Sequence, residues 1–460
     1  MAPNDSDSKP DPVAGDFSLK VFLTFLIPSL IGASTFLIPF TIEDEFFVGM
    51  VLMADWLMEL LDGYLPAIVV VVFWISLLVS MYVKIFRPSW IKYDIVKEIF
   101  DVEAGWFVLR ILGTVLATLT YYQFGPVFII SDATGGEMLN VLLPVLLAFF
   151  FFAALLLPFL VDYGFMEFIG SLVRKPFRVI FNLPGRSAID ATASWFGSGT
   201  VGILITMRQY ESGFYNQKEA ATIATTFSIV SIAFSLVVIE FVELRHMFLE
   251  YYSTVIVSGI LAAVILPRIY PLSRKPITYY EPVGKQIIED KQYDANIFFD
   301  SLYKAMDRAR MAPGPQDLAR KSVHNLADIM FSLLPLVFAI GAIALILAEY
   351  TPFFTWLSYP MVPFLQLLQL PEAQLAAPAT LVGFADMFVP ALLVSDLESE
   401  LTRFVIAALS VSQLIYMSEV GALIIKSKIP LNFIELVIIF LLRTFITLPI
   451  IALMAHLFFF

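Results

Sequence analysis

A glycine-rich stretch with two hydroxyl side chains offers the clearest ligand-binding chemistry in this chain. Residues 196–202 read FGSGTVG, which places Ser198 and Thr200 among three glycines. Glycine lets a ligand approach the backbone closely, and freed backbone N–H groups bind polar solutes and ions. The alternative is a close helix crossing, since small residues also line helix contacts in membranes. We expect Ser198, Gly199 and Thr200 to bind substrate, because a simple crossing does not require three glycines.

Asp386 is the residue best suited to coupling an ion, because it lies inside an apolar stretch, residues 375–395. An ionisable side chain in such surroundings is energetically unfavourable and is usually functional. The structural alternative is an N-cap for a helix over 387–395. Glu419 is the second predicted ion-coupling residue, with pairing to Lys426 as its structural alternative.

Hydroxyl and amide side chains also gather near the middle of two further apolar segments. The predicted substrate-binding residues there are Thr225, Thr226, Ser228 and Ser231 in the first segment, and Ser410, Ser412 and Gln413 in the second. A serine in a membrane helix commonly bonds to the carbonyl four residues earlier, which would make these groups structural. Their occurrence in both segments favours a binding role. Arg443 lies within an apolar run and needs a partner, which we expect to be Glu435 or Glu419 in a structural ion pair.

The composition defines the class of protein. Hydrophobic residues make up 59% of the 460 residues and charged residues 15%, and the mean hydropathy is +0.84, so lipid must surround most of the chain. The absence of cysteine excludes disulfides and thiol chemistry, and the three histidines lie too far apart to predict a metal cluster. No catalytic motif is present, which predicts that the chain is not an enzyme and uses no cofactor beyond a coupling ion, Na⁺ or H⁺. We expect the lipid bilayer and a small polar solute as partners, and we expect no nucleic acid. Whether the chain forms a homo-oligomer is left open.

Nine apolar runs are long enough to cross a membrane as helices. They are 21–40, 64–83, 107–123, 140–161, 220–242, 251–267, 326–348, 403–425 and 431–457. The preceding tail, residues 1–20, is polar and Pro-rich and is predicted to be disordered. Because the tail lacks a basic region and a cleavage site, the first run is predicted to be a retained helix and not a signal peptide.

The distribution of lysine and arginine predicts the orientation in the membrane. If the N-terminus is cytoplasmic, the inside segments hold 25 of the 28 Lys and Arg residues, while the outside segments are acidic and the C-terminus is external. Two interrupted apolar stretches, 190–207 and 375–395, then have both of their flanks on one side, cytoplasmic for the first and external for the second. We therefore expect two re-entrant hairpins that enter from opposite faces. FGSGTVG would form the tip of the first, where its glycines allow the chain to reverse.

The two hairpin sequences resemble each other. ATASWFGSGTVGILI (191–205) aligns with ATLVGFADMFVPALL (379–393) at a constant offset of 188. Downstream, TTFSIVS (225–231) aligns with AALSVSQ (407–413) at an offset of 182. Entry from opposite faces makes the two copies an inverted repeat. Inverted repeats with helices interrupted at mid-membrane are typical of secondary transporters.

The run QYESGFYNQKEAATIATTFSIVSIAFSLVVIE (209–240) resembles the nucleoside-recognition, or gate, domain of bacterial membrane proteins, in particular the YjiH-like inner-membrane branch. The motif residues are Tyr210, Glu211, Gly213, Lys218, Glu219, Ile223 to Thr225, Phe227, Ser228, Val230 and Ser231. The resemblance implies a bacterial inner-membrane location and a distant similarity to the core of concentrative nucleoside transporters. Those transporters are cation-coupled and move their substrate by an elevator-like motion. The chain lacks their glutamine-threonine-glutamate hairpin signature, and Ser198 and Thr200 stand at the corresponding tip.

Together these features predict an all-α integral membrane protein with about nine transmembrane helices and two re-entrant hairpins in an inverted repeat. The predicted organisation is a disordered cytoplasmic tail (1–20), scaffold helices (21–162), a first gate repeat (163–270), a cytoplasmic linker (271–325) and a second gate repeat (326–460). The predicted function is secondary active transport of a small polar organic solute, with a nucleoside-like solute as one candidate, coupled to Na⁺ or H⁺. A non-transport recognition or assembly subunit in the membrane, and a passive channel, are the alternatives.

Overall fold

The computed structural model describes residues 18–38, 40–42, 45–86, 94–196, 199–227, 229–285 and 296–460. The regular structure of these residues is helical apart from one hairpin of two short antiparallel strands, β1 (Phe40–Ile42) and β2 (Glu45–Phe47). Seven helical segments of the described chain are long and apolar enough to cross a membrane. They are Leu19–Phe36, Leu65–Phe86, Ala104–Tyr121, Val127–Val161, Arg245–Arg268, Pro315–Tyr350 and Phe433–Phe459. These segments correspond to seven of the nine predicted spans.

The other two predicted spans, 220–242 and 403–425, are not single helices. The first is divided into α12 (Gln217–Thr226) and α13 (Ile232–Phe241), and the second into α22 (Glu400–Ser412) and α23 (Val420–Lys426). Hydropathy reports how apolar a run is, and it does not detect where the backbone leaves the helix. We call the interruption between α12 and α13 the first break, and the interruption between α22 and α23 the second break.

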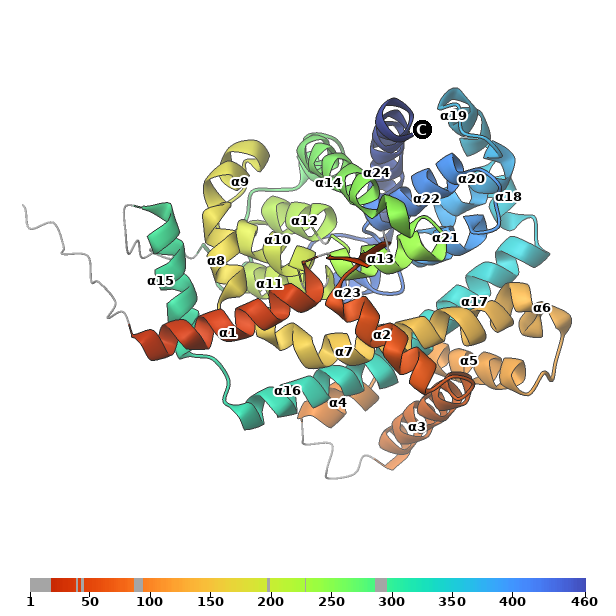
Figure 1. The fold of residues 1–460 in the computed structure, drawn as a ribbon, viewed down its shortest axis with the longest axis horizontal. Helices are drawn as coiled ribbons and strands as arrows, with labels where there is room; N and C mark the ends of the chain where they lie inside the picture. The colour runs from red at the N-terminus through yellow and green to blue at the C-terminus, as the bar shows by residue number, and fades with distance from the viewer. Residues whose placement is uncertain are drawn as a thin grey trace, which may run out of the picture.

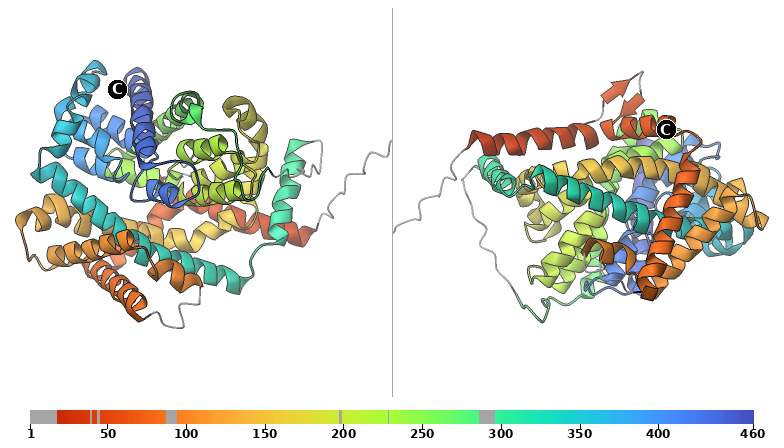
Figure 2. Two further views of the ribbon diagram at one scale, coloured as in Figure 1. Left: turned by 180° about the vertical axis from the view of Figure 1, so that it is seen from behind. Right: turned by 90° about the horizontal axis from the view of Figure 1, so that it is seen from below.

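The N-terminal helices and one long later segment form a scaffold. Its helices are α1 (Leu19–Phe36), α2 (Gly49–Leu60), α3 (Leu65–Phe86), α4 (Asp94–Phe100), α5 (Ala104–Tyr121), α6 (Val127–Ile130), α7 (Leu143–Val161), α16 (Pro315–Asp328) and α17 (Leu334–Tyr350). The π-helical turns η2 (Asp132–Gly136) and η3 (Met138–Leu142) precede α7, and η7 (Ile329–Leu333) joins α16 to α17. α17 packs against α5 and α16 against α7, as the two opposite views in Figures 1 and 2 show. Gly113 makes the α5–α17 crossing close, because a Cβ there would lie 2.3 Å from the carbonyl oxygen of Pro335.

Two further sets of elements follow the same order: short helices, a helical hairpin, a broken helix and a long helix. The first set contains α8 (Phe165–Leu172), α9 (Arg174–Phe181), α10 (Ser187–Phe196), α11 (Gly199–Glu211), α12, α13 and α14 (Phe248–Ile265). The second contains α18 (Phe353–Ser358), α19 (Met361–Leu367), α20 (Ala373–Val382), α21 (Val389–Val394), α22, α23 and α24 (Phe433–Met454). α11 contacts α23 and α21 contacts α13, so each hairpin touches the second half of the other set's broken helix. The long helices α14 and α24 pack against each other at the top of Figure 1. The order of elements therefore repeats in the same way as the aligned sequences.

Gly202 brings the two arms of the first hairpin together. The arms, α10 and α11, run antiparallel, and a Cβ at position 202 would lie 1.6 Å from the Oγ of Ser194 and 3.1 Å from the carbonyl oxygen of Asp190. Because Gly202 lies within helix α11, its role is close packing and not the chain reversal that the sequence predicts for it. The other predicted tip residues, Gly197 and Ser198, lie outside the described residues.

The segment predicted to be a linker, residues 271–325, contains helix α15 (Ile297–Arg310) and most of α16. α15 packs against α1 and α8. At the end of α7, Asp162 forms ion pairs with Arg308 at 3.2 Å and with Lys321. These contacts attach α15 and α16 to the scaffold and to the start of the first repeat.

Candidate solute-binding site

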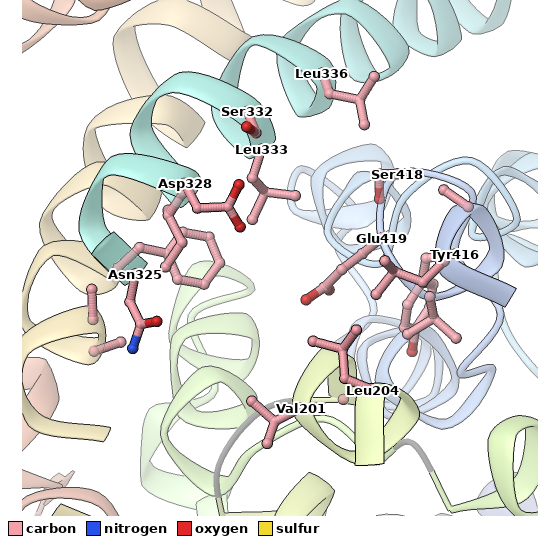
Figure 3. Close-up of a pocket in the computed structure, with 18 of the residues that line it drawn as sticks. Val201, Leu204, Asn325, Asp328, Ser332, Leu333, Leu336, Tyr416, Ser418 and Glu419 are labelled. Atoms are coloured by element: carbon pink, nitrogen blue, oxygen red, sulfur yellow. The ribbon is translucent and has the colours of Figure 1, made fainter. Parts of the chain in front are cut away.

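A cavity of about 400 Å³ lies where the scaffold meets both repeats. Its wall includes Gly199 at the start of α11, Ser231 at the first break, Met387 in the second hairpin and Glu419 at the second break. Scaffold residues complete the wall, and Asp328 and Glu419 project into the space from opposite sides (Figure 3). Small-molecule sites are typically concave and mostly apolar, with a few converging polar groups. The cavity has this character and is the candidate site.

Local hydrogen bonds stabilise the helix ends that the two breaks create. At the first break, the Ser231 hydroxyl caps α13 by accepting a hydrogen bond from the Phe234 N–H at 3.3 Å. At the second, Leu414 has a positive φ of 63°, a conformation that does not continue a right-handed helix. The Tyr416 hydroxyl then donates to the carbonyl oxygen of Ser410 at 2.8 Å. Backbone groups freed by a break thus find partners inside the protein, as they must at membrane depth.

The loop of the second hairpin pairs with the second break along the backbone. The N–H groups of Met417 and Ser418 donate to the carbonyl oxygens of Phe384 and Ala385 at 2.9 and 3.0 Å. Asp386 follows directly, and its Oδ1 accepts a hydrogen bond from the Phe388 N–H at 2.8 Å. Its side chain is 5% exposed and lies next to Met387, not in the cavity wall itself. This bond is a local turn two residues long: the N-cap position of α21 is Phe388 and no side chain caps that helix, so the N-cap alternative offered by the sequence is not found.

Gln413 connects three elements at the second break. Its amide nitrogen donates to the carbonyl oxygen of Thr380 in α20 at 2.7 Å and to the hydroxyl of Thr444 in α24 at 2.9 Å. Its amide oxygen is buried without a hydrogen-bond partner and occupies the place of a Cβ on Gly383, which would lie 1.9 Å from it. Gln413 is absent from the cavity wall, so in this arrangement it positions the hairpin and the break.

Four of the five predicted hydroxyl ligands that the structure describes bond to their own helices. Those of Thr225, Thr226, Ser410 and Ser412 each donate to a carbonyl three or four residues earlier, at 2.6 to 2.8 Å. All four side chains are buried and lie outside the cavity wall, which is the structural alternative weighed from the sequence. Ser198, Ser228 and the side chain of Thr200 lie outside what the structure describes, so the predicted proximity of Asp386 to Ser198 does too.

The scaffold contributes polar residues that the sequence analysis did not single out. Asn325, Asp328 and Ser332 come from the α16–η7 segment, and Arg110 comes from α5. The guanidinium of Arg110 donates to the carbonyl oxygen of Ile99 at 3.1 and 3.2 Å. An arginine inside the apolar run FVLRILG was the available signal.

Two charged partners expected from the sequence differ in the structure. The ammonium group of Lys426 lies 3.8 Å from the ring centre of Trp106 and forms a cation–π contact, so the pairing with Glu419 is not made. Glu435 pairs with Lys275 at 2.7 Å. The expected ion pair of Arg443 with Glu435 or Glu419 is therefore wrong, because the Nε of Arg443 donates to the carbonyl oxygen of Ser412.

The first hairpin carries a buried carboxylate that sequence reasoning missed. Asp190 in α10 accepts hydrogen bonds from the Thr206 hydroxyl at 3.1 Å and from the Tyr215 hydroxyl at 2.9 Å. These bonds join both arms of the hairpin to the segment that leads into α12. An aspartate inside an apolar stretch was the same signal that identified Asp386.

The chemistry of the cavity suits binding more than bond-making. Within the described residues, no group of three or more ligating side chains is arranged to hold a metal ion. Carboxylates at Asp328 and Glu419 and a hydroxyl at Ser231 face a largely apolar interior. Such a surface can fix the polar groups of a small solute while apolar walls exclude water.

Comparison with known proteins identifies relatives of the chain. Residues 143–245 match the Gate family model, described as nucleoside recognition, and this range includes the first hairpin and the first break. An uncharacterized protein of Alkalihalophilus pseudofirmus strain OF4 is 52% identical over 439 residues, which cover 95% of each chain. No solved structure matches the chain. With identity at this level over nearly its whole length, the chain belongs to the same family as the Alkalihalophilus protein, and it is a multi-pass membrane protein with a gate domain of the nucleoside-recognition type.

Proposed function

We propose that this chain is a secondary active transporter that carries a small polar organic solute together with Na⁺ or H⁺. The two repeats would move against the scaffold in an elevator-like manner. The observation that carries the proposal is the single cavity bordered by both hairpins, both breaks and the scaffold. The gate domain supports a transporter family, and its description makes a nucleoside-like solute the first candidate.

The position of the cavity gives the mechanism its physical basis. A solute held by Gly199 and Ser231 of the first repeat and by Glu419 of the second would travel with the repeats. Asp328 stays with the scaffold, so displacement of the repeats would change which side of the membrane reaches the solute. Discontinuous helices at membrane depth are the usual location of such sites. Asp386 and Glu419 are the proposed carriers of the coupling charge.

The proposal includes an orientation, with a cytoplasmic N-terminus, an external C-terminus and a bacterial inner-membrane location. The chain has no native cysteine, so single cysteines can report it. Met311, after α15, is 71% exposed, and Trp356, in α18, is 74% exposed. In intact cells a membrane-impermeant maleimide should label Trp356→Cys and should label Met311→Cys only after permeabilisation. Labelling of Met311→Cys from outside would contradict the orientation and the inverted repeat together.

Transport itself can be tested by counterflow in proteoliposomes with radiolabelled uridine, guanosine and a wider panel of polar solutes. Ala153 lines the cavity on α7, so Ala153→Trp should fill it and reduce exchange at least about tenfold. Leu78 on α3 is 48% exposed and lies away from the cavity, so Leu78→Trp is the matched control and should exchange normally. Absence of exchange by the natural chain would favour the recognition or assembly subunit. Exchange without accumulation under any ion gradient would favour a passive channel.

A further inference from the structure

The second break carries a positive charge of its own. Arg443 in α24 is 0% exposed, its Nε donates to the carbonyl oxygen of Ser412, and its Nη1 is buried without a hydrogen-bond partner. The ion pairs found among the described residues do not include Arg443, and Glu435 is engaged by Lys275. A buried guanidinium at membrane depth requires negative charge close by.

Two carboxylates lie close to this region in the chain: Glu419 in the second break, and Asp386 directly after the hairpin loop that pairs with the break. Arg443 reaches the same break from α24, through its hydrogen bond to the Ser412 carbonyl. Two negative charges therefore share the surroundings of one positive charge. One additional positive charge would make this region neutral, and a buried charge that stays uncompensated is strongly unfavourable.

Several backbone oxygens around the second break already have donors. Tyr416 donates to the Ser410 carbonyl, Arg443 to the Ser412 carbonyl and Gln413 to the Thr380 carbonyl. Backbone N–H groups donate to the Phe384 and Ala385 carbonyls of the second hairpin loop, whereas the buried amide oxygen of Gln413 has no donor among the described residues. A hard metal ion needs several oxygen ligands, and at this place it would also be repelled by the guanidinium. A proton needs a single carboxylate oxygen.

Glu419 is the carboxylate that is open to a proton. It lines the cavity, and no hydrogen bond or ion pair in the described chain engages its carboxylate, whereas Asp386 is nearly inaccessible and accepts a hydrogen bond from the Phe388 N–H. The titratable or charged groups on the elements around it are Asp386, Tyr416, Arg443, Lys426, Arg110 and Asp328. Lys426 is engaged by the ring of Trp106, and Arg110 by the carbonyl oxygen of Ile99.

We propose that the coupling ion is a proton carried by Glu419, and that Arg443 takes the place of a coupling metal ion at the second break. The inference rests on the proposed function and names its ion. The one bond that changes is the O–H bond of the Glu419 carboxyl group. That bond forms when the cavity faces the external side and is broken when the cavity faces the cytoplasm.

The proton site can be tested without any solute by infrared difference spectroscopy of the purified chain between acidic and alkaline pH. A band from protonated carboxyl groups shielded from water should be present in the natural chain and should lose intensity in Glu419→Gln, where the buried Asp190 and Asp386 can still contribute. Its intensity should be unchanged in Glu398→Gln, because Glu398 is an exposed carboxylate between α21 and α22. An undiminished band in Glu419→Gln would overturn the assignment.

Arg443 should act on the titration of Glu419 as a positioned charge. Arg443→Gln removes the positive charge, so the pH midpoint of the band should move upward, while Arg443→Lys should keep it near that of the natural chain. An unchanged midpoint in Arg443→Gln would contradict the role given to this side chain. Replacing K⁺ by Na⁺ should leave the thermal unfolding midpoint of the natural chain unchanged, and a Na⁺-specific rise would indicate a metal-ion site.

Transport is measured with radiolabelled uridine in proteoliposomes. A pH gradient should drive accumulation and a Na⁺ gradient should not. Glu419→Gln should lose accumulation while keeping counterflow exchange. If the natural chain exchanges no solute, the proposed function fails, and the infrared and Na⁺ measurements still decide the proton site. Accumulation driven by Na⁺ at constant pH would overturn the inference while leaving the transporter proposal intact.

Discussion

Adding a single methyl group to Gly202 should separate the two arms of the first hairpin. The Cβ of Gly202→Ala would lie 1.6 Å from the Oγ and 2.9 Å from the Cβ of Ser194, and 3.1 Å from the carbonyl oxygen of Asp190. Over-packing of this kind costs up to about 3 kcal/mol. Replacing glycine by alanine inside a helix recovers about 1 kcal/mol. The expected net loss is about 2 kcal/mol of unfolding free energy.

Substitutions at Ser194 can remove the two contacts with its side chain one at a time. Combining Gly202→Ala with Ser194→Ala removes the 1.6 Å contact and leaves the 2.9 Å contact, so stability should recover in part. Combining it with Ser194→Gly removes both contacts and should recover more of the loss, less the roughly 0.5–1 kcal/mol that a glycine costs inside helix α10. Gly259→Ala in α14 is the matched control, because a Cβ there has nothing within 4 Å. It should be neutral or slightly stabilising.

The assay is unfolding of the purified chain in mixed micelles, followed by circular dichroism, with uridine exchange measured in parallel. The Gly202→Ala single variant should be the least stable, and the two double variants should follow in the order given. If Gly202→Ala is as stable as Gly259→Ala, the arms are not in close contact at this position. If the substitutions at Ser194 restore nothing, the packing partner is another group.

Three further outcomes are expected from the packing and charges. Gly113→Ala should lower the unfolding midpoint more than Gly202→Ala, because its Cβ would meet the backbone oxygen of Pro335 at 2.3 Å and a backbone atom cannot rotate away. Tyr215→Phe leaves the buried carboxylate of Asp190 with one donor fewer, and it should cost about 1–3 kcal/mol in the same unfolding assay. Burial raises the pKa of Glu167 above its ordinary 4.5, and the nearby Arg308 opposes that shift only in part. The natural chain should therefore lose stability relative to Glu167→Gln as the pH rises from 4.5 through the raised pKa, and equal pH profiles of the two proteins would contradict this.

Several features of the fold were predictable because they depend on short stretches of chain. The lengths of the apolar runs identified seven spans, since crossing a bilayer requires a continuous stretch of fixed length. The two interrupted apolar stretches predicted two re-entrant hairpins, and the structure contains helical hairpins at both places. The sequence did not predict that two of the apolar runs form broken helices. Their breaks lie within apolar runs, and the side chains that stabilise them, such as Gln413, also occur in continuous helices.

By itself the sequence determined the class of the protein and the gate region. It also identified Asp386 and Glu419 as carboxylates within apolar segments. Hydropathy and motifs are properties of neighbouring residues, so these features need no tertiary structure. Only the tertiary structure decided which polar groups share a space. Asp328 and Glu419 line the same cavity although they are 91 positions apart in the chain. Arg443 donates a hydrogen bond to the carbonyl oxygen of Ser412. It also showed that Thr225, Thr226, Ser410 and Ser412 satisfy their own helices. The physical reason is that a hydroxyl or a charge can be satisfied by several partners, and the packing of helices far apart in the sequence selects among them.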